Sequence, residues 1–171
     1  MIHQSIYLVG LMAVGKSTVG KLLAERLNRP FFDSDKEVEK NAGAEISWIF
    51  DVEGEQGFRD REEQVICELT KVSGIVVATG GGVVERENNR RRISDGGLVL
   101  HLDCPNKTLI KRVRNDKKRP LLKGSDPDEV LFNLKKRRDP LYKEMADYRF
   151  QTDKKNTQVL VNSIISRLSH N

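Results

Sequence analysis

Short apolar runs alternate with longer segments of helical periodicity along the whole chain. The runs that predict strands are brief, rich in β-branched or aromatic residues and bounded by polar or turn-forming residues; they are Ile6–Val9, Phe31–Asp33, Ile75–Thr79, Leu98–Leu102 and Tyr148–Gln151. Apolar residues at helical spacing predict helices over residues 16–28, 34–41, 45–52, 57–72, 84–94, 105–114, 126–145 and 156–168. This alternation predicts an α/β fold of three layers, in which a parallel sheet is covered by helices on both faces. Ligands of such sheets bind beyond the carboxyl ends of the strands.

A glycine-rich segment follows the first predicted strand and leads into the first predicted helix. Residues 10–18 read GLMAVGKST and match the P-loop pattern GxxxxGK[ST]. Backbone N–H groups at a helix N-terminus bind phosphate. In the P-loop motif, Lys16 is expected to reach the β- and γ-phosphates and Ser17 is expected to bind Mg²⁺. Thr18 is expected to begin the buried side of the helix. The predicted nucleotide-binding residues here are Gly10, Ala13, Val14, Gly15, Lys16, Ser17 and Thr18.

Length and composition favour one compact domain over residues 1–171, with a formal net charge of +5. The sequence has neither a long apolar span nor a signal-peptide pattern, which predicts a soluble, cytoplasmic protein without membrane contact. Cys67 and Cys104 lie far apart without a CxxC pattern and are expected to be reduced thiols. The three histidines are scattered, so nothing indicates a histidine metal cluster.

Basic residues are concentrated in residues 107–123 and 135–138. The first stretch has no aromatic residue for stacking on bases, which argues against nucleic acid as a partner. Small anionic ligands explain the charge better, although a solvated basic face remains an alternative for several of the lysines.

Two carboxylates, Asp33 and Asp35, stand at the end of the second predicted strand in the segment FFDSD. Asp33 is a candidate for the Mg²⁺ shell, and Asp35 is a candidate for orienting a substrate hydroxyl and accepting its proton. The alternative is a helix N-cap, because Asp and Ser favour that position.

The third predicted strand runs directly into Gly80, Gly81 and Gly82. Adjacent glycines are expected where the backbone must pass close to another group, and a ligand is the natural candidate. No acid ends this strand, so the role in the metal shell is left to Asp33.

Three further segments carry arginines suited to anions. Arg59 follows GEQGF and offers a planar fork to a carboxylate, although it could simply pair with Asp60 or Glu63 on a surface helix. Arg119 lies in the segment KRPLL, which could fold over a triphosphate as a lid or remain a surface loop without catalytic function. The segment RRDPLY combines two arginines with a proline, Pro140, that predicts a helix interruption.

The P-loop, FxDxD, GExxFR, TGGG, RPLL and RxPLY, in this order over nearly the whole chain, closely resemble shikimate kinases. The resemblance implies a nucleoside monophosphate kinase type of P-loop fold, with a five-stranded sheet in the order 2-3-1-4-5 and a lid at about residues 113–125. It also implies MgATP-dependent phosphorylation of the 3-hydroxyl of shikimate, on the route to chorismate and aromatic amino acids. A monomer that binds ATP and shikimate is expected.

The resemblance also implies roles for single residues. Lys16 and Arg119 would stabilise the transferred phosphoryl group, Ser17 would bind Mg²⁺ directly and Asp33 through water. Asp35 would bind the shikimate hydroxyls and is the candidate base. The remaining assignments are Arg59 and Arg138 for the carboxylate, Gly80, Gly81 and Gly82 against the ring, Arg112 and Lys155 for adenine, and the helices of about residues 34–60 for shikimate.

Ala13 departs from the family pattern, in which a glycine is common. If this position needs a positive φ, Ala13 would strain the loop by about 1 kcal/mol.

Two alternatives stay open at this point. A kinase of another hydroxylated acid, such as gluconate, would share the P-loop and the lid but not both arginines together with FxDxD. A regulatory GTPase would need NKxD, and the nearest string, Asn106-Lys107-Thr108-Leu109, lacks the Asp. A nucleic-acid-associated NTPase is the other member of that class.

Overall fold

The computed structural model describes residues 4–114, 124, 126–153 and 156–169 of the chain. Its strands are β1 Ser5–Val9, β2 Phe31–Asp33, β3 Val76–Ala78, β4 Gly97–Asp103 and β5 Tyr148–Gln151. Its helices are α1 Lys16–Leu27, α2 Ser34–Ala42, α3 Ile46–Leu69, the 3-10 turn η1 Gly81–Glu85, α4 Glu87–Gly96, α5 Asn106–Arg114, α6 Pro127–Met145 and α7 Thr157–Ser169.

The strands form one parallel sheet in the order β2-β3-β1-β4-β5, which confirms the predicted topology. In the centre, Leu8 of β1 is paired with Ala78 of β3 and with Leu100 of β4. Because all strands run in the same direction, the loops that follow them meet at one edge of the sheet. The P-loop, Asp33 and the glycine turn after β3 are therefore neighbours.

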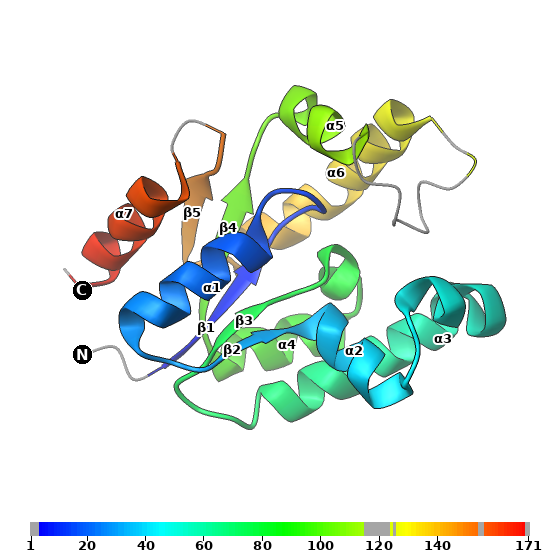
Figure 1. Cartoon of the computed structure of the whole chain (residues 1–171), viewed down its shortest axis with the longest axis horizontal. Coiled ribbons are helices and arrows are strands. Elements are labelled where there is room, and N and C mark those ends of the chain that lie inside the picture. The colour runs from blue at the N-terminus through cyan, green and yellow to red at the C-terminus, as the bar shows by residue number, and fades with distance from the viewer. Residues whose placement is uncertain (1–3, 115–123, 125, 154–155, 170–171) are drawn as a thin grey trace.

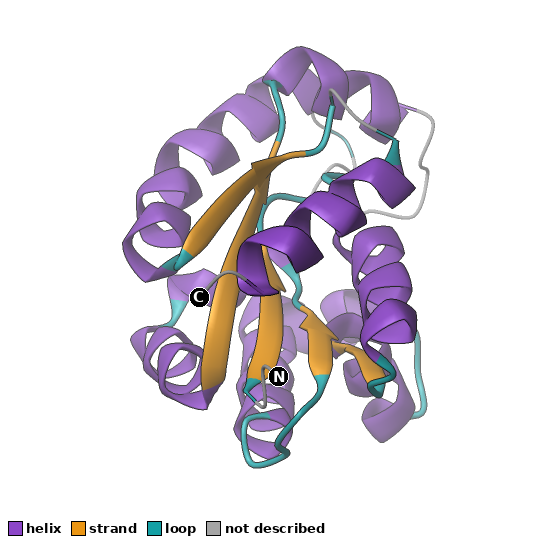
Figure 2. Ribbon diagram, turned by 90° about the vertical axis from the view of Figure 1, so that its left-hand side faces the viewer, coloured by secondary structure: helices purple, strands orange, loops and turns teal. Residues whose placement is uncertain are grey.

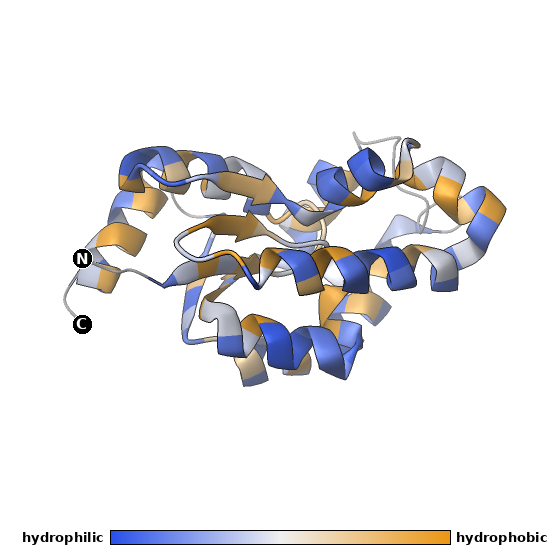
Figure 3. Ribbon diagram, turned by 90° about the horizontal axis from the view of Figure 1, so that it is seen from below, coloured by the Kyte–Doolittle hydropathy of each residue, from blue (hydrophilic) through white to orange (hydrophobic). Residues whose placement is uncertain are grey.

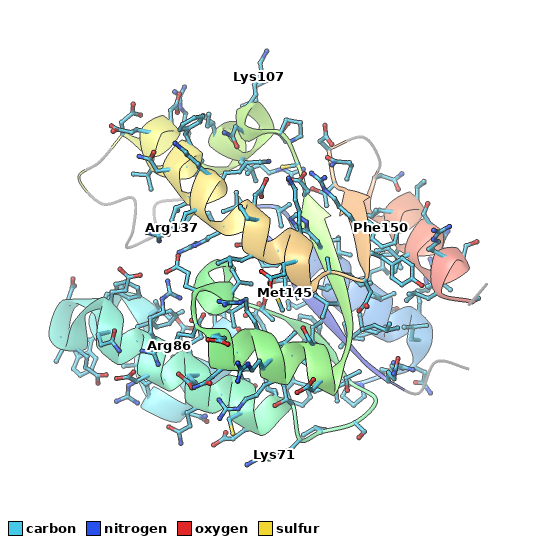
Figure 4. All side chains as sticks on the ribbon, turned by 180° about the vertical axis from the view of Figure 1, so that it is seen from behind. Lys71, Arg86, Lys107, Arg137, Met145 and Phe150 are labelled. Atoms are coloured by element: carbon cyan, nitrogen blue, oxygen red, sulfur yellow. The ribbon has the colours of Figure 1, made fainter. Side chains whose placement is uncertain are left out.

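Helices cover both faces of the sheet (Figures 1 and 2). Helices α1 and α7 pack together on one face, whereas α4 and α6 cover the other, with α3 beside α4 (Figure 4). The strand residues 6–9 are fully buried, and hydrophobic stretches lie on strands as well as on helices (Figure 3). Burial on both faces explains why the central strands β1 and β3 read as nearly continuous apolar runs.

The two helices expected over residues 45–52 and 57–72 are present as the two halves of α3, separated by a kink at the non-helical Gly54, which has φ 72° and ψ −179°. Two other predictions about helices differ from the structure. The helix expected over residues 84–94 is split into η1 and α4. Pro140 does not interrupt its helix, because α6 continues to Met145.

Most of the predicted lid, including Arg119, lies outside the described residues, as does Lys155. In the part of the chain that is described, no helix combines the length and apolar character needed to cross a membrane. Cys67 and Cys104 are free thiols, as predicted.

Candidate active site

The loop between β1 and α1 forms one wall of a cavity of about 530 Å³. Gly15 is the N-cap of α1 in a left-handed conformation, with φ 105°. Ala13 has φ 61°, so this position does require the positive φ that an L-residue adopts only with strain. The backbone N–H groups at the start of α1 thus face a space that can hold an anion.

The cavity contains most of the residues predicted to bind the nucleotide. Its lining comprises Met12, Ala13, Val14, Gly15, Lys16, Ser17, Thr18, Val19, Asp33, Asp35, Thr79, Gly81, Arg112, Thr152, Thr157 and Leu160. Gly10, Arg59, Gly80, Gly82 and Arg138 are not part of this lining. Thr18 is exposed, so the expectation that it begins the buried face of α1 is wrong; that face begins at Val19.

Lys16 is a buried cation at the first position of α1. Its Nζ donates hydrogen bonds to the carbonyl oxygens of Gly10 and Leu11, both at 2.7 Å. These two hydrogen bonds hold the ammonium group at the wall of the cavity.

Ser17 and Asp33 join the P-loop to the end of β2. Ser17 Oγ donates to Asp33 Oδ2 at 2.5 Å, while Asp33 Oδ1 accepts from the backbone N–H of Asp35 at 3.1 Å and of Lys36 at 3.4 Å. Asp33 is thus the N-cap of α2, and its other oxygen is directed to the P-loop. A hydroxyl and a carboxylate at the phosphate loop form a donor set that fits Mg²⁺, which prefers oxygen ligands.

Asp35 lies in the first turn of α2, among other carboxylates. Burial, Glu62 and Asp33 raise the pKa of Asp35 to about 7, against the opposing effect of Lys16 and Arg59. A carboxyl group whose pKa lies near neutrality is suited to exchanging a proton with a hydroxyl. The alternative N-cap role belongs to Asp33, which leaves Asp35 without that structural function.

Gly80 permits the chain to pass between two acids. A Cβ on Gly80 would lie 2.6 Å from Asp35 Oδ1 and 2.7 Å from Glu62 Oε1, so no other residue fits without displacing them. The backbone N–H of Gly80 donates to the buried Ser34 Oγ at 2.9 Å. This hydrogen bond ties the glycine turn to the segment that carries Asp35.

Arg59 is buried and held by acidic residues of its own helix. Its Nη1 donates to Glu62 Oε2 at 2.7 Å and its Nη2 to Glu55 Oε1 at 3.2 Å. The surface pairing with Asp60 or Glu63 that the sequence left open does not occur in the structure, where both of these acids pair with Arg86. A Cβ on Gly82 would clash with the Arg59 guanidinium group, so the glycine turn lies directly against it.

Arg138 approaches the same turn from α6. Its side chain is 1% exposed, and its Nε donates to Glu85 Oε1 at 2.6 Å. Its Nη1 lies 3.5 Å from the position that a Cβ on Gly81 would take. The neighbouring Tyr142 donates from its hydroxyl to the carbonyl oxygen of Gly81 at 2.5 Å, which fixes the turn against α6.

Arg112 lies against the P-loop rather than over open solvent. Its Nη1 donates to the carbonyl oxygens of Ala13 at 3.0 Å and Val14 at 3.2 Å, and its Nη2 to that of Thr152 at 3.5 Å. This places its guanidinium plane at the cavity, between the loop and the segment that follows β5.

Glu62 and Glu85 are site residues that the sequence reasoning missed. Glu62 could have been found, because it follows Arg59 by three positions on a helix and such residues share a face. Glu85 is 53 positions away from its partner Arg138, and no local pattern indicates that pairing.

A group of possible metal ligands lies between β4, β5 and α6. Ligand atoms of His101, Asp103 and Asp139 are within 4.8 Å of one another. Asp103, however, already accepts from Lys135 Nζ at 2.9 Å and from Arg149. Two cations on the Asp103 carboxylate disfavour a divalent ion there, so Asp103 is the acceptor of two ion pairs.

Comparisons with known proteins agree with this geometry. A family model described as shikimate kinase matches residues 12–169. Shikimate kinase 1 of Yersinia enterocolitica is 52% identical over 169 residues, which are 98% of each protein.

Solved structures give the same result. Shikimate kinase from Acinetobacter baumannii, in complex with shikimate, has a TM-score of 0.96 and 44% identity, and the match covers 99% of this chain and 94% of that one. Shikimate kinase from Aquifex aeolicus has a TM-score of 0.84 and 37% identity, with 96% of each chain covered. By its sequence, its sheet order and the residues around its phosphate loop, this chain belongs to the shikimate kinase family.

Proposed function

We propose that this protein transfers the γ-phosphoryl group of ATP to the 3-hydroxyl of shikimate, giving shikimate 3-phosphate and ADP on the route to chorismate and the aromatic amino acids. The observation that carries the proposal is the position of Asp35, which lines the same cavity as Lys16 and Ser17. An acid that can take a hydroxyl proton is thus next to the groups suited to a triphosphate.

On the nucleotide side, the P-loop residues Gly10, Ala13, Val14, Gly15, Lys16, Ser17 and Thr18 bind the phosphates. Arg112 stacks on adenine, which its position at the cavity wall supports. Arg119, within a lid at about residues 113–125, and Lys155 in the adenine loop are further proposals that rest on the family pattern alone.

Ser17 and Asp33 would hold Mg²⁺, Ser17 directly and Asp33 through water. When bound, the ion would neutralise charge on the phosphates and orient them. The Ser17–Asp33 hydrogen bond supports this assignment, because it brings both oxygen donors to one point of the P-loop.

On the acceptor side, Asp35 orients the hydroxyl and accepts its proton, while Arg59 and Arg138 bind the carboxylate. Gly80, Gly81 and Gly82 lie against the ring, and the helices of about residues 34–60 form the wall of this pocket. The two arginines suit a small carboxylate because each presents a planar fork of N–H donors.

The proposal is tested by measuring ADP release from MgATP with shikimate, gluconate, quinate, a nucleoside monophosphate or no acceptor. Stimulation by shikimate alone is the expected result. Stimulation by gluconate instead would favour the alternative kinase, and stimulation only by RNA or DNA would favour a nucleic-acid-associated NTPase. If the protein binds ATP but no acceptor stimulates ADP release, the assignment of the P-loop stands and the assignment of shikimate as the acceptor is wrong. A monomeric state remains a prediction, which sedimentation would test.

A further inference from the structure

Glu85 bridges two consecutive arginines of α6. Its Oε1 accepts from Nε of the buried Arg138 at 2.6 Å and from Nη2 of the exposed Arg137, also at 2.6 Å. Arg137 projects from α6 toward the turn that precedes α4 (Figure 4). Glu85 is therefore held from the solvent side by one arginine while it holds the other in the interior.

The contact with Nε determines which edge of the Arg138 guanidinium group remains available. A guanidinium group can offer a carboxylate either its Nε side or its terminal Nη1–Nη2 edge. Glu85 occupies Nε, whereas Nη2 is buried and has no hydrogen-bond partner in the described structure. The unpartnered Nη2 and the Nη1 that lies beside Gly81 together form the terminal edge of the Arg138 guanidinium group.

The 3-10 turn Gly81–Glu85 carries two of the pocket glycines, Gly81 and Gly82, and also Glu85, which holds Arg138. Burial acts to raise the pKa of Glu85, but hydrogen bonds and charge from Arg138 and Arg137 outweigh it, so the pKa is lowered. At neutral pH the Glu85 side chain is an ionised acceptor, and it holds a donor fork in one orientation.

We propose that Glu85 is a positioning residue for the acceptor site, which turns the terminal edge of Arg138 toward the substrate carboxylate. Arg137 supports this arrangement by holding Glu85. The inference rests on the proposed function, since it needs Arg138 to bind an acceptor carboxylate. Glu85 acts through Arg138 and does not itself contact the acceptor.

The first test is steady-state kinetics of Glu85→Gln. Loss of the Glu85 charge should raise the KM for shikimate about tenfold, because the guanidinium group of Arg138 is no longer fixed. The kcat and the KM for ATP should stay within about twofold of the wild-type values. The matched control is Glu87→Gln, which breaks an exposed Glu–Arg pair on α4 and should leave all three constants unchanged.

A double-mutant cycle separates positioning from general stability. In an Arg138→Ala background, Glu85→Gln should add less than about a twofold change in the shikimate KM, because the group it orients is absent. With the methyl ester of shikimate, which lacks the carboxylate charge, Glu85→Gln should likewise cost less than about twofold in kcat/KM. Equal losses with shikimate and with the ester would overturn the inference.

The outcomes distinguish this inference from the proposed function. An unchanged shikimate KM in Arg138→Ala would remove the carboxylate assignment itself. A raised KM in Arg138→Ala but not in Glu85→Gln would remove only the role of Glu85. If Glu85→Gln does not fold, Arg137→Ala serves instead; it should raise the shikimate KM about threefold through a less constrained Glu85, and no change would contradict the proposal.

Discussion

The pKa of Asp35 is raised by burial and by the carboxylates of Glu62 and Asp33, against the cations Lys16 and Arg59. If Asp35 orients the hydroxyl and accepts its proton, Asp35→Asn should lower kcat with shikimate by about 10²-fold or more, because the amide cannot act as a base. Steady-state ADP release measures this change. Asp95→Asn, at an exposed position of α4, is the control and should leave kcat unaltered. A near-normal kcat in Asp35→Asn would mean that this carboxylate is not used in the reaction.

Ala13 holds a left-handed conformation at the phosphate loop, with φ 61°. Ala13→Gly should raise the free energy of unfolding by about 1 kcal/mol, since relief of an αL strain of about 1–2 kcal/mol exceeds the added chain entropy of glycine. Urea denaturation checks this. Ala42→Gly, at the end of α2, should instead lower the free energy of unfolding. A destabilised Ala13→Gly would show that the loop is not strained there.

Local sequence patterns were enough to locate the P-loop, because it is contiguous and its geometry follows from adjacent residues. They also singled out Asp35, Arg59 and Arg138, which the structure places at the cavity or beside the glycine turn; the roles of these residues in binding stay predictions. What they could not give is the set of acids that hold those arginines. Glu85 meets Arg138 only after the chain has passed through β4 and α5, and such long-range pairs leave no spacing to detect.

Among the elements, α3 depends on one glycine for its shape. Gly54 has φ 72° and ψ −179°, a region that is essentially restricted to glycine, and a Cβ there would meet nothing within 4 Å. Gly54→Ala should therefore lower the free energy of unfolding by about 1–3 kcal/mol through backbone strain alone.

The same substitution should raise the shikimate KM more than the ATP KM. The start of α3 is tied to α2 by the hydrogen bond from the Ile46 N–H to Glu39, and Arg59 follows the kink, so the kink sets their relative position. Gly43→Ala, which alters a left-handed helix cap at φ 65°, is the comparison and should cost less, about 1 kcal/mol. Equal stability of Gly54→Ala and the wild type would show that the kink can be straightened at no cost.

Strands and helices were predicted to within about one or two residues where their patterns were strong, as expected of apolar strands and amphipathic helices. The glycines near residues 54–57 correctly indicated the kink that separates the two halves of α3. The interruption predicted at Pro140 is absent, because packing of the whole of α6 prevails over the local preference of proline. The helix expected over residues 84–94 is divided into η1 and α4.

At the scale of the whole molecule, His101 is a titratable group of the core. It is 1% exposed and stacks on Tyr142 at 5.1 Å between ring centroids. Burial lowers the pKa of His101 to about 4, and the cations Arg149, Lys135 and Lys143 act in the same direction, against Asp103. The folded protein therefore keeps this imidazole neutral under mildly acidic conditions.

This lowered pKa makes stability depend on pH. The unfolded chain protonates His101 near pH 6.5 and the folded chain only near pH 4, so stability from this group is lost as the pH falls between these values. His101→Gln should gain up to about 3 kcal/mol relative to the wild type over that interval. Urea denaturation at pH 7.5, 6 and 4.5 gives the difference, and a constant difference would contradict the assignment.

Arg59 and Arg138 are both buried beside the glycine turn, and both have glutamate partners in the protein. If these two arginines bind the acceptor carboxylate as proposed, that carboxylate meets cations that are buried and already paired with glutamates. Ions in the medium screen such interior charges weakly. The KM for the acceptor should consequently change little with ionic strength. The enzyme would then keep a nearly constant apparent affinity for its acceptor when the salt content of the cell fluctuates.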